Sequence, residues 1–219
     1  MNLFDILGPV MVGPSSSHTA GAVRIGYVAR HLLKDEPCEV KIGLYGSFAK
    51  TGKGHGTDRA LIAGILDMHP DDIRIPESFE LAEKAGMKVE FYTFDMRNAH
   101  PNTALIDITG KNGRKLSVQA SSLGGGRIMV NRLDGIDVNF SAEKPTLIVH
   151  NIDQPGHVAE VTSMLSHKCV NIATMQLFRD KRGGYAVMVI ETDQSIPEEA
   201  IKWLEHLEGV IKVTYVNID

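Results

Sequence analysis

The last third of the chain carries the feature that most restricts its fold, an ordered alternation of strand and helix patterns. After the apolar run TLIVHN, the turn DQPGHV leads into a helical pattern, and two strand-like runs follow on either side of the turn KRGG. A second helix is predicted between Pro197 and Gly209, because proline is favoured at helix starts and glycine at helix ends. With the final run VIKVTYVNI, the order β-α-β-β-α-β predicts an antiparallel sheet covered by two helices.

Residues 1–140 show a less regular mixture of helices and hairpins. Helices are predicted over AGAVRIGYVARHLLK and DRALIAGILDM, the second capped by Thr57 or Asp58. CEVKIGLYGSF alternates like a strand, and a Lys-Asn-Gly turn predicts a hairpin over TALIDITGKNGRKLSVQASS. The polar segment SAEKP predicts a short linker to residues 146–219. Because the regular βαβ alternation of a Rossmann fold is missing, we expect an α+β protein, a mixed α/β domain with antiparallel hairpins followed by the βαββαβ domain.

Composition excludes several classes of function. The net charge of −4 and the pI of about 6.1 argue against a nucleic-acid-binding surface, which is normally basic. The sequence has no apolar run near the ~20 residues of a membrane helix, and its start, MNLFDILGPV, lacks the features of a signal peptide. Cys38 and Cys169 are the only cysteines, so neither a disulfide framework nor a metal site is expected in this chain. We expect a cytoplasmic protein.

The segment GSFAKTGKGHGTDRA looks superficially like a phosphate-binding loop. That motif needs four residues between its first glycine and Gly-Lys, whereas five lie between Gly46 and Gly52, and Gly54 stands where Ser or Thr is required. Nucleotide binding is therefore rejected. His55, flanked by glycines, suits a general base, with Thr57 positioned to hold its ring. Alternatively, Thr57 or Asp58 caps a helix and His55 is a solvated loop residue.

The segment GPSSSHTAG places four hydroxyls and one histidine before a predicted helix. Hydroxyls at a helix start can form an anion site, and an amino-acid carboxylate would fit it. One serine or threonine acting as a cap would explain a single hydroxyl, with the others as turn residues. In HPNTA, Pro101 sets a turn that brings His100 and Asn102 towards the same region, and SSLGGGR is typical of a hairpin exit.

The loop NIDQPGHVAEV is the informative segment of the second part. Its Pro-Gly turn leads into a helix and gathers polar groups that suit a small zwitterion, joined by a further residue in the turn before the next strand. These candidate effector-binding residues are Asn151, Gln154, Gly156, His157 and Asn171. The alternative is a strand-to-helix connection that uses Pro-Gly for its geometry alone.

Together, the four segments GPSSSHTAG, GSFAKTGKGHGTDRA, HPNTA and SSLGGGR make the first 137 residues or so resemble the beta subunit of bacterial iron–sulfur-dependent L-serine dehydratases. The second part resembles an ACT domain, an amino-acid-sensing module with a ferredoxin-like βαββαβ fold. A domain similar to the first part also serves as an allosteric domain in some phosphoglycerate dehydrogenases. Fold alone therefore does not decide between catalysis and regulation.

The resemblance implies a subunit that helps convert L-serine to pyruvate and ammonia and is inactive alone. A [4Fe-4S] cluster is implied on the cysteines of a partner alpha subunit, because this chain lacks the cluster cysteines. His55 is implied as the base for the Cα proton, with Thr57 as its relay and with His18 and Thr19 close to the chemistry. The implied substrate contacts are Ser15, Ser16, Ser17 and Asn102. The alternative is a purely regulatory module without catalytic residues, and in either case the ACT domain predicts self-association.

Overall fold

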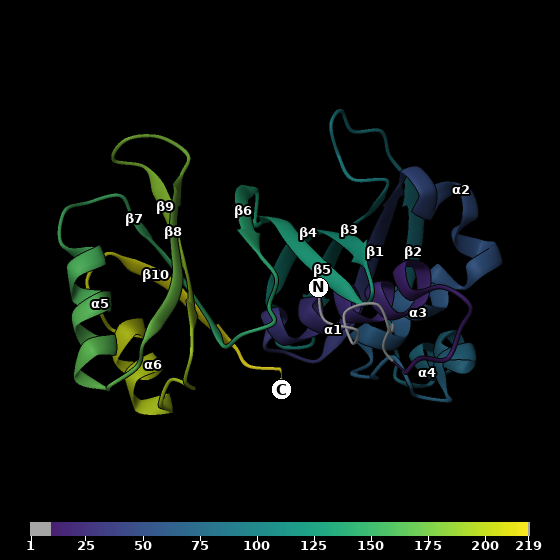
Figure 1. The fold of residues 1–219 in the computed structure, drawn as a ribbon, viewed down its shortest axis with the longest axis horizontal. Helices are drawn as coiled ribbons and strands as arrows, with labels where there is room; N and C mark the ends of the chain where they lie inside the picture. Colours follow the sequence, from purple (N-terminus) through teal and green to yellow (C-terminus); the bar gives the residue numbers. More distant parts are fainter. Residues whose placement is uncertain (1–9, 219) are drawn as a thin grey trace. The chain divides into compact units, whose positions relative to one another are not determined.

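The computed structural model describes residues 10–218, which form two compact units, one up to Gly135 and one from Ile136 onward (Figure 1). The expectation that the chain starts without a signal peptide falls mainly on residues outside this range. The helices and strands agree with the α+β class predicted from the sequence. Among the described residues, none of the helices has the length and apolar character needed to cross a lipid bilayer.

The first unit is a mixed sheet with helices packed against it. Its strands are β1 (Pro37–Tyr45), β2 (Lys88–Thr93), β3 (Asn102–Gly110), β4 (Lys115–Gly124) and β5 (Arg127–Leu133), in the order β2-β1-β3-β4-β5. Only β1 and β2 are parallel, joined by a crossover through α2 (Gly46–His55), α3 (Thr57–Ile65), the short 3₁₀ turn η3 (Ile75–Glu77) and α4 (Ser78–Lys84). The remaining pairs are antiparallel, and β3 and β4 form the hairpin predicted around Lys-Asn-Gly.

Helix α1 (Gly21–Leu33) lies between the sheet and α3. It packs against β3, β4 and β5 on one side and against α3 on the other. Nine of its thirteen residues are buried, which is why its sequence is apolar on more than one face. A one-turn π-helix, η2 (Ser16–Ala20), leads directly into it.

Two glycines allow α1 and α3 to approach each other at backbone distance. A Cβ atom on Gly26 would collide with the Leu61 carbonyl oxygen and lie 2.9 Å from the Ile65 amide nitrogen. A Cβ on Gly64 would collide with the Val23 carbonyl oxygen in the same way. Because backbone atoms cannot move aside as a flexible side chain can, the crossing of these helices requires glycine at both positions.

The second unit has the predicted βαββαβ order. After β6 (Ile136–Phe140) come β7 (Thr146–Ile152), α5 (His157–His167), β8 (Ile172–Arg179), β9 (Tyr185–Thr192), α6 (Glu198–Glu205) and β10 (Val210–Val216). The antiparallel sheet has the order β10-β7-β9-β8, and both helices cover one face of it (Figure 1). Leu147, Val149 and Met188 from the sheet pack with Val161 and Leu204 from the helices in its core.

Two local expectations need correction, and two elements were not predicted. The segment that contains His55 is helical from Gly46 through His55, and Gly56, which follows it, adopts a left-handed conformation with φ of 70°. The next helix has Gly56 at its N-cap and no side-chain cap bond, so neither Thr57 nor Asp58 caps it. Strand β2 and helix α4 were not predicted. The segment SAEKP between Phe140 and Thr146 is neither helix nor strand; within it Ala142 is buried and the Ser141 hydroxyl donates to Glu191, at 3.5 Å.

The close contact between α1 and α3 predicts that replacing a glycine by alanine destabilises the protein at Gly64 but not at Gly54. Replacing Gly64 by Ala should lower the free energy of unfolding by about 1–3 kcal/mol, because overpacking against backbone outweighs the better helix propensity of alanine. The matched control is Gly54→Ala, in α2, where an added Cβ has no atom within 4 Å. Urea titration followed by circular dichroism should show the control to be as stable as the wild type or more so. Equal stability of the two variants would contradict the close crossing.

A histidine and hydroxyl cluster as the candidate active site

The hydroxyl-rich segment before α1 forms a compact turn. Ser15 is the N-cap of the π-helical turn, and its hydroxyl accepts a hydrogen bond from the His18 amide at 3.2 Å. The Thr19 amide donates to the Ser15 carbonyl at 2.8 Å, and the Gly21 amide donates to the Ser16 carbonyl. One serine therefore acts as the cap expected from the sequence. The other polar side chains are left to form the cluster described next.

His18 is the centre of this cluster. The residue is 9% exposed, and both ring nitrogens lie within hydrogen-bonding distance of hydroxyls. Its Nδ1 atom is 3.4 Å from the Ser15 hydroxyl and 3.2 Å from that of Ser17. Its Nε2 atom is 3.1 Å from the hydroxyls of both Ser47 and Thr51, on α2. The imidazole thus joins the π-helical turn to α2.

Burial lowers the pKa of His18 below its ordinary value of 6.5, and the nearby charge of His55 lowers it further. A hydrogen bond involving the Ser47 backbone opposes the shift without cancelling it. The neutral imidazole is therefore the favoured form near neutral pH, and a neutral ring can both donate to one hydroxyl and accept from another.

His55 lies at the C-terminal end of α2 with its ring centre 5.1 Å from that of His18. Its Nδ1 atom is 3.2 Å from the carbonyl oxygen of Thr51, one helical turn earlier. A carbonyl can only accept, so Nδ1 carries the hydrogen, and in the neutral ring the lone pair is left on Nε2. The side chain is exposed. In its neutral form, His55 therefore has Nε2 as the unprotonated nitrogen of an exposed side chain beside His18.

Ser47 and Thr51 belong to the cluster but were not singled out from the sequence. Their signal was nevertheless present, since Ser47, Thr51 and His55 are spaced by four residues in GSFAKTGKGH. Residues at this spacing lie on one face of a helix. Treating the glycine-rich segment as a loop concealed this pattern.

The remaining predicted site residues are distributed around the cluster. Thr19 and Thr57 are both buried, and within residues 10–218 neither hydroxyl has a hydrogen-bond partner. Thr57 packs towards Gly52, while the His55 ring is held by Thr51. Asn102, the first residue of β3, lies beside the start of α2 through a bridge with Gly46, and its backbone amide donates to His100 Nδ1 at 3.2 Å.

The hairpin exit in SSLGGGR also reaches the hydroxyl segment. The Gly125 amide donates to the Ser16 hydroxyl at 3.3 Å, from a turn between β4 and β5 whose glycines have positive φ. On β4, Ser122 is fully buried against Gly21 at the start of α1, and its hydroxyl has no hydrogen-bond partner among the described residues. The tip of the hairpin therefore supports the turn that carries His18.

The chain's own residues do not fit an iron–sulfur cluster. Cys38 donates its thiol hydrogen to the Thr109 carbonyl at 3.3 Å, and Cys169 lies in the other unit. Within the described residues there is no group of three or more His, Cys, Asp or Glu side chains arranged to hold a metal ion. No step of the chemistry is therefore assigned to a cluster held by this chain.

Comparison with known proteins identifies the family. The family model described as "Serine dehydratase beta chain" matches residues 2–93, and the "AHAS small subunit-like ACT domain" matches residues 147–212. A Bacillus subtilis (strain 168) protein named "Probable L-serine dehydratase, beta chain" is 43% identical over 98% of this chain and 97% of its own length. The chain belongs to the serine dehydratase beta-chain family. The resemblance noted in the sequence is thereby confirmed.

Two further relatives show in which proteins similar chains occur. The "L-serine dehydratase, beta chain" of Peptoniphilus asaccharolyticus is 38% identical over 98% of this chain and 97% of its own length. A "D-3-phosphoglycerate dehydrogenase" of Archaeoglobus fulgidus is 23% identical over 98% of this chain but only 39% of its own length. Similar chains therefore occur both as separate dehydratase subunits and as part of a larger enzyme with another name.

In the ACT unit, the predicted effector residues do not all lie together. Gly156 is the N-cap of α5, and His157 begins the helix as expected, but the imidazole is buried beneath Gly209. Asn151, at the end of β7, is buried and donates to the Ile152 carbonyl at 2.7 Å. Gln154 is exposed in the loop between them.

Asn171 lies at the opposite end of the same sheet. Its side chain donates to Asp193 at 2.7 Å. Asp193 follows the end of β9 at which Glu191 pairs with Thr146, the first residue of β7. Asn151 lies near the other end of β7, where it pairs with Ala186. Within one chain, Asn171 therefore does not join the other four residues.

The contact between Gly21 and Ser122 predicts a compensating pair of substitutions. In Gly21→Ala the new Cβ would collide with the Ser122 hydroxyl and lie 2.8 Å from its Cβ, so the free energy of unfolding should fall by about 1–3 kcal/mol. Adding Ser122→Gly removes both atoms. In a double-mutant cycle measured by urea titration, the two changes should be non-additive by about 1 kcal/mol or more. Additive effects would mean that the two residues do not touch.

The lowered pKa of His18 predicts a pH-dependent stability. On unfolding, the pKa of His18 returns towards 6.5. As the pH falls below that value, the unfolded state therefore binds more protons than the folded state, and the free energy of unfolding decreases. The decrease ends once the pH is below the folded-state pKa. Between about pH 7.5 and 5.5, the wild type should therefore lose more free energy of unfolding than the His18→Gln variant. An equal or smaller loss in the wild type would contradict a buried, neutral His18.

Proposed function

We propose that this chain is the beta subunit of an L-serine dehydratase and that its histidine and hydroxyl cluster forms one side of the active site. The observation that carries the proposal is the contact of His55 Nδ1 with the Thr51 carbonyl oxygen, at 3.2 Å. Its Nδ1 hydrogen is directed to the Thr51 carbonyl, which leaves Nε2 as a proton acceptor on an exposed side chain beside His18. The named activity of the two beta-chain relatives gives the substrate, L-serine.

The reaction requires removal of the Cα proton and departure of the β-hydroxyl group. As the Cα–H bond breaks, its electron pair forms the Cα–Cβ double bond and the hydroxyl leaves as water after protonation. The aminoacrylate formed then tautomerises and is hydrolysed to pyruvate and ammonia. The first step requires a general base that accepts the Cα proton. His55 Nε2 is that base in our proposal.

The other residues of the cluster hold the substrate and His55 in place. Ser15, Ser16 and Ser17 offer hydroxyls to the serine carboxylate, with Thr19 and Asn102 bordering the same region. His18, kept neutral by burial, adds no positive charge that would oppose proton uptake by His55. A relay through Thr57 would require its hydroxyl to turn from its present buried position.

A partner alpha subunit completes the site in this proposal. The resemblance implies that it brings a [4Fe-4S] cluster, which as a Lewis acid would polarise the substrate carboxylate and hydroxyl. Cys38 and Cys169, in separate units, cannot replace the cluster ligands. We also propose that the protein is cytoplasmic. In this proposal residues 146–219 bind an amino-acid effector. Its binding site lies near Asn151, Gln154, Gly156 and His157, and a second copy of the chain supplies Asn171.

The decisive experiment replaces His55 by Ala in the complex reconstituted with its alpha subunit. Loss of a general base should lower kcat by roughly 10²- to 10⁴-fold, with a much smaller change in KM, because the carboxylate contacts remain. Added imidazole should restore part of the rate, since His55 is exposed. Serine deuterated at Cα should react more slowly than ordinary serine in the variant.

Thr57→Val provides the matched control in the same segment. It removes a buried hydroxyl that has no partner among the described residues, so stability should be unchanged or slightly higher and kcat close to that of the wild type. A large loss of kcat here would instead support the relay. A His55→Ala complex with normal turnover but altered serine activation would favour the purely regulatory alternative and end the catalytic assignment.

A further inference from the structure

The first unit has a hollow of about 530 Å³ at the edge of its sheet. Residues of α2, α3, α4, β1 and β2 line it, and β2 is an outermost strand of the sheet. Leu44 and the fully buried Phe48 contribute to the lining, together with Phe79 and Phe91, whose ring centres are 6.1 Å apart. This size and this apolar lining are typical of a site for a small molecule.

The aromatic wall of the hollow is held in place by α4. Phe79 is 41% exposed, although it is a large apolar side chain. Ser78, directly before it, is fully buried, and its hydroxyl donates to the Arg59 carbonyl at 2.9 Å. This hydrogen bond ties the start of α4 to the first turn of α3, where Asp58 lines the same hollow. A ligand that packs against Phe79 therefore meets a wall that is already positioned.

Two residues of opposite charge line the hollow beside these apolar groups. Lys50, on α2, is exposed, and it has no ion pair among the side chains that the structure describes. Asp58 is half-buried, and one of its carboxylate oxygens accepts a hydrogen bond from the Arg59 backbone amide at 2.8 Å. Within residues 10–218 it has no ion pair either. A ligand with a carboxylate and an ammonium group can provide a partner for both side chains.

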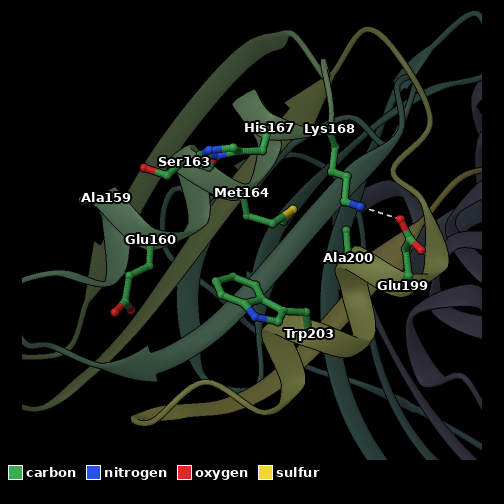
Figure 2. Close-up of a pocket in the computed structure, with 9 residues that line it drawn as sticks. All are labelled: Ala159, Glu160, Ser163, Met164, His167, Lys168, Glu199, Ala200 and Trp203. Atoms are coloured by element: carbon green, nitrogen blue, oxygen red, sulfur yellow. Dashed lines mark hydrogen bonds and ion pairs between the residues drawn. The ribbon is translucent and has the colours of Figure 1, made fainter.

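The hollow between α5 and α6, with a volume of about 700 Å³, differs in this respect. It also has an exposed aromatic side chain, Trp203, but its charged residues are already engaged within the chain (Figure 2). Lys168 is ion-paired with Glu199, and Glu160 lies 3.6 Å from His157. Free charges of both signs beside an aromatic wall are therefore a property of the hollow in the first unit.

A polypeptide segment paired with the free edge of β2 is the alternative occupant. Lys88 and Glu90 are both exposed on this strand. Charged side chains on an edge strand discourage the addition of a further strand. The edge of β2 is therefore less suited to a peptide than the hollow beside it is to a small zwitterion.

We propose that this hollow binds a free α-amino acid with an apolar side chain. Its carboxylate pairs with Lys50 and its ammonium group with Asp58, while its side chain packs against Phe79 and Phe91. An α-amino acid carries both charged groups on one carbon atom, so it presents them together and leaves the side chain free to enter the hollow. An aromatic side chain suits the two phenylalanines, since edge-to-face contacts between rings are favourable. This site is separate from the His18 cluster and does not rest on the proposed dehydratase activity.

The experiment titrates the full chain with L-phenylalanine and measures the heat of binding. Ala49→Phe, which fills the hollow from α2, should abolish binding at this site. Lys50→Met and Asp58→Asn should each weaken it roughly tenfold or more, because each removes a charge-assisted contact. In the wild type, 3-phenylpropionate lacks the ammonium group and 2-phenylethylamine lacks the carboxylate. Both should bind at least tenfold more weakly than L-phenylalanine.

Two further variants are the matched controls. Lys84→Met makes the same exchange as Lys50→Met, but on α4 and outside the lining, and Gln154→Ala changes the proposed effector loop of the second unit. Both should bind L-phenylalanine like the wild type, and circular dichroism should show all variants folded. Binding that survives both Ala49→Phe and Lys50→Met, or that is lost in Gln154→Ala, would overturn the proposal. So would a wild-type chain that binds no L-phenylalanine, or binding that disappears when the alpha subunit is added, since the hollow would then belong to the interface with that subunit.

Discussion

The candidate site depends on the contact between the backbones of α1 and α3. Gly26 and Gly64 remove the side chains that normally keep two helices apart, and each presents its Cα to carbonyl and amide groups of the other helix. The start of α1 carries the π-helical turn with His18, and the start of α3 follows directly on His55. Two residues without side chains therefore set the separation between the segments that hold the two histidines.

His18 connects these helical segments within the candidate site. Its ring lies between the hydroxyls of the π-helical turn and those of α2, so a shift of either element changes the hydrogen bonds of the same imidazole. The hairpin tip adds a third support through Gly125 and Ser16. The second unit has its own apolar core and contributes none of these groups. The candidate site is therefore built from the first unit alone.

Much of the fold could be predicted from the sequence because its signals were local. The βαββαβ order followed from apolar periodicity, Pro197 and Gly209, and the β3–β4 hairpin from its Lys-Asn-Gly turn. The helix α2 could not be predicted in this way, since glycines at positions 46, 52 and 54 lower its helix propensity. Its packing against β1, β3 and the π-helical turn overrides that propensity. Ser47 and Thr51 were missed for this reason, and the position of Asn171 depended on strand pairing that loop sequences do not reveal.

The partner of His55 Nδ1 is a main-chain carbonyl, which makes this contact insensitive to side-chain substitution at the acceptor. A side-chain acceptor can be lost through a single codon change, but the carbonyl of residue 51 is present whichever amino acid occupies that position. As long as α2 stays helical, a family member could exchange the Thr51 hydroxyl, and so change a hydrogen bond of His18, without altering the contact of His55 Nδ1. The orientation of the His55 ring is thus inherited with the helix itself, whereas its surroundings are free to diverge.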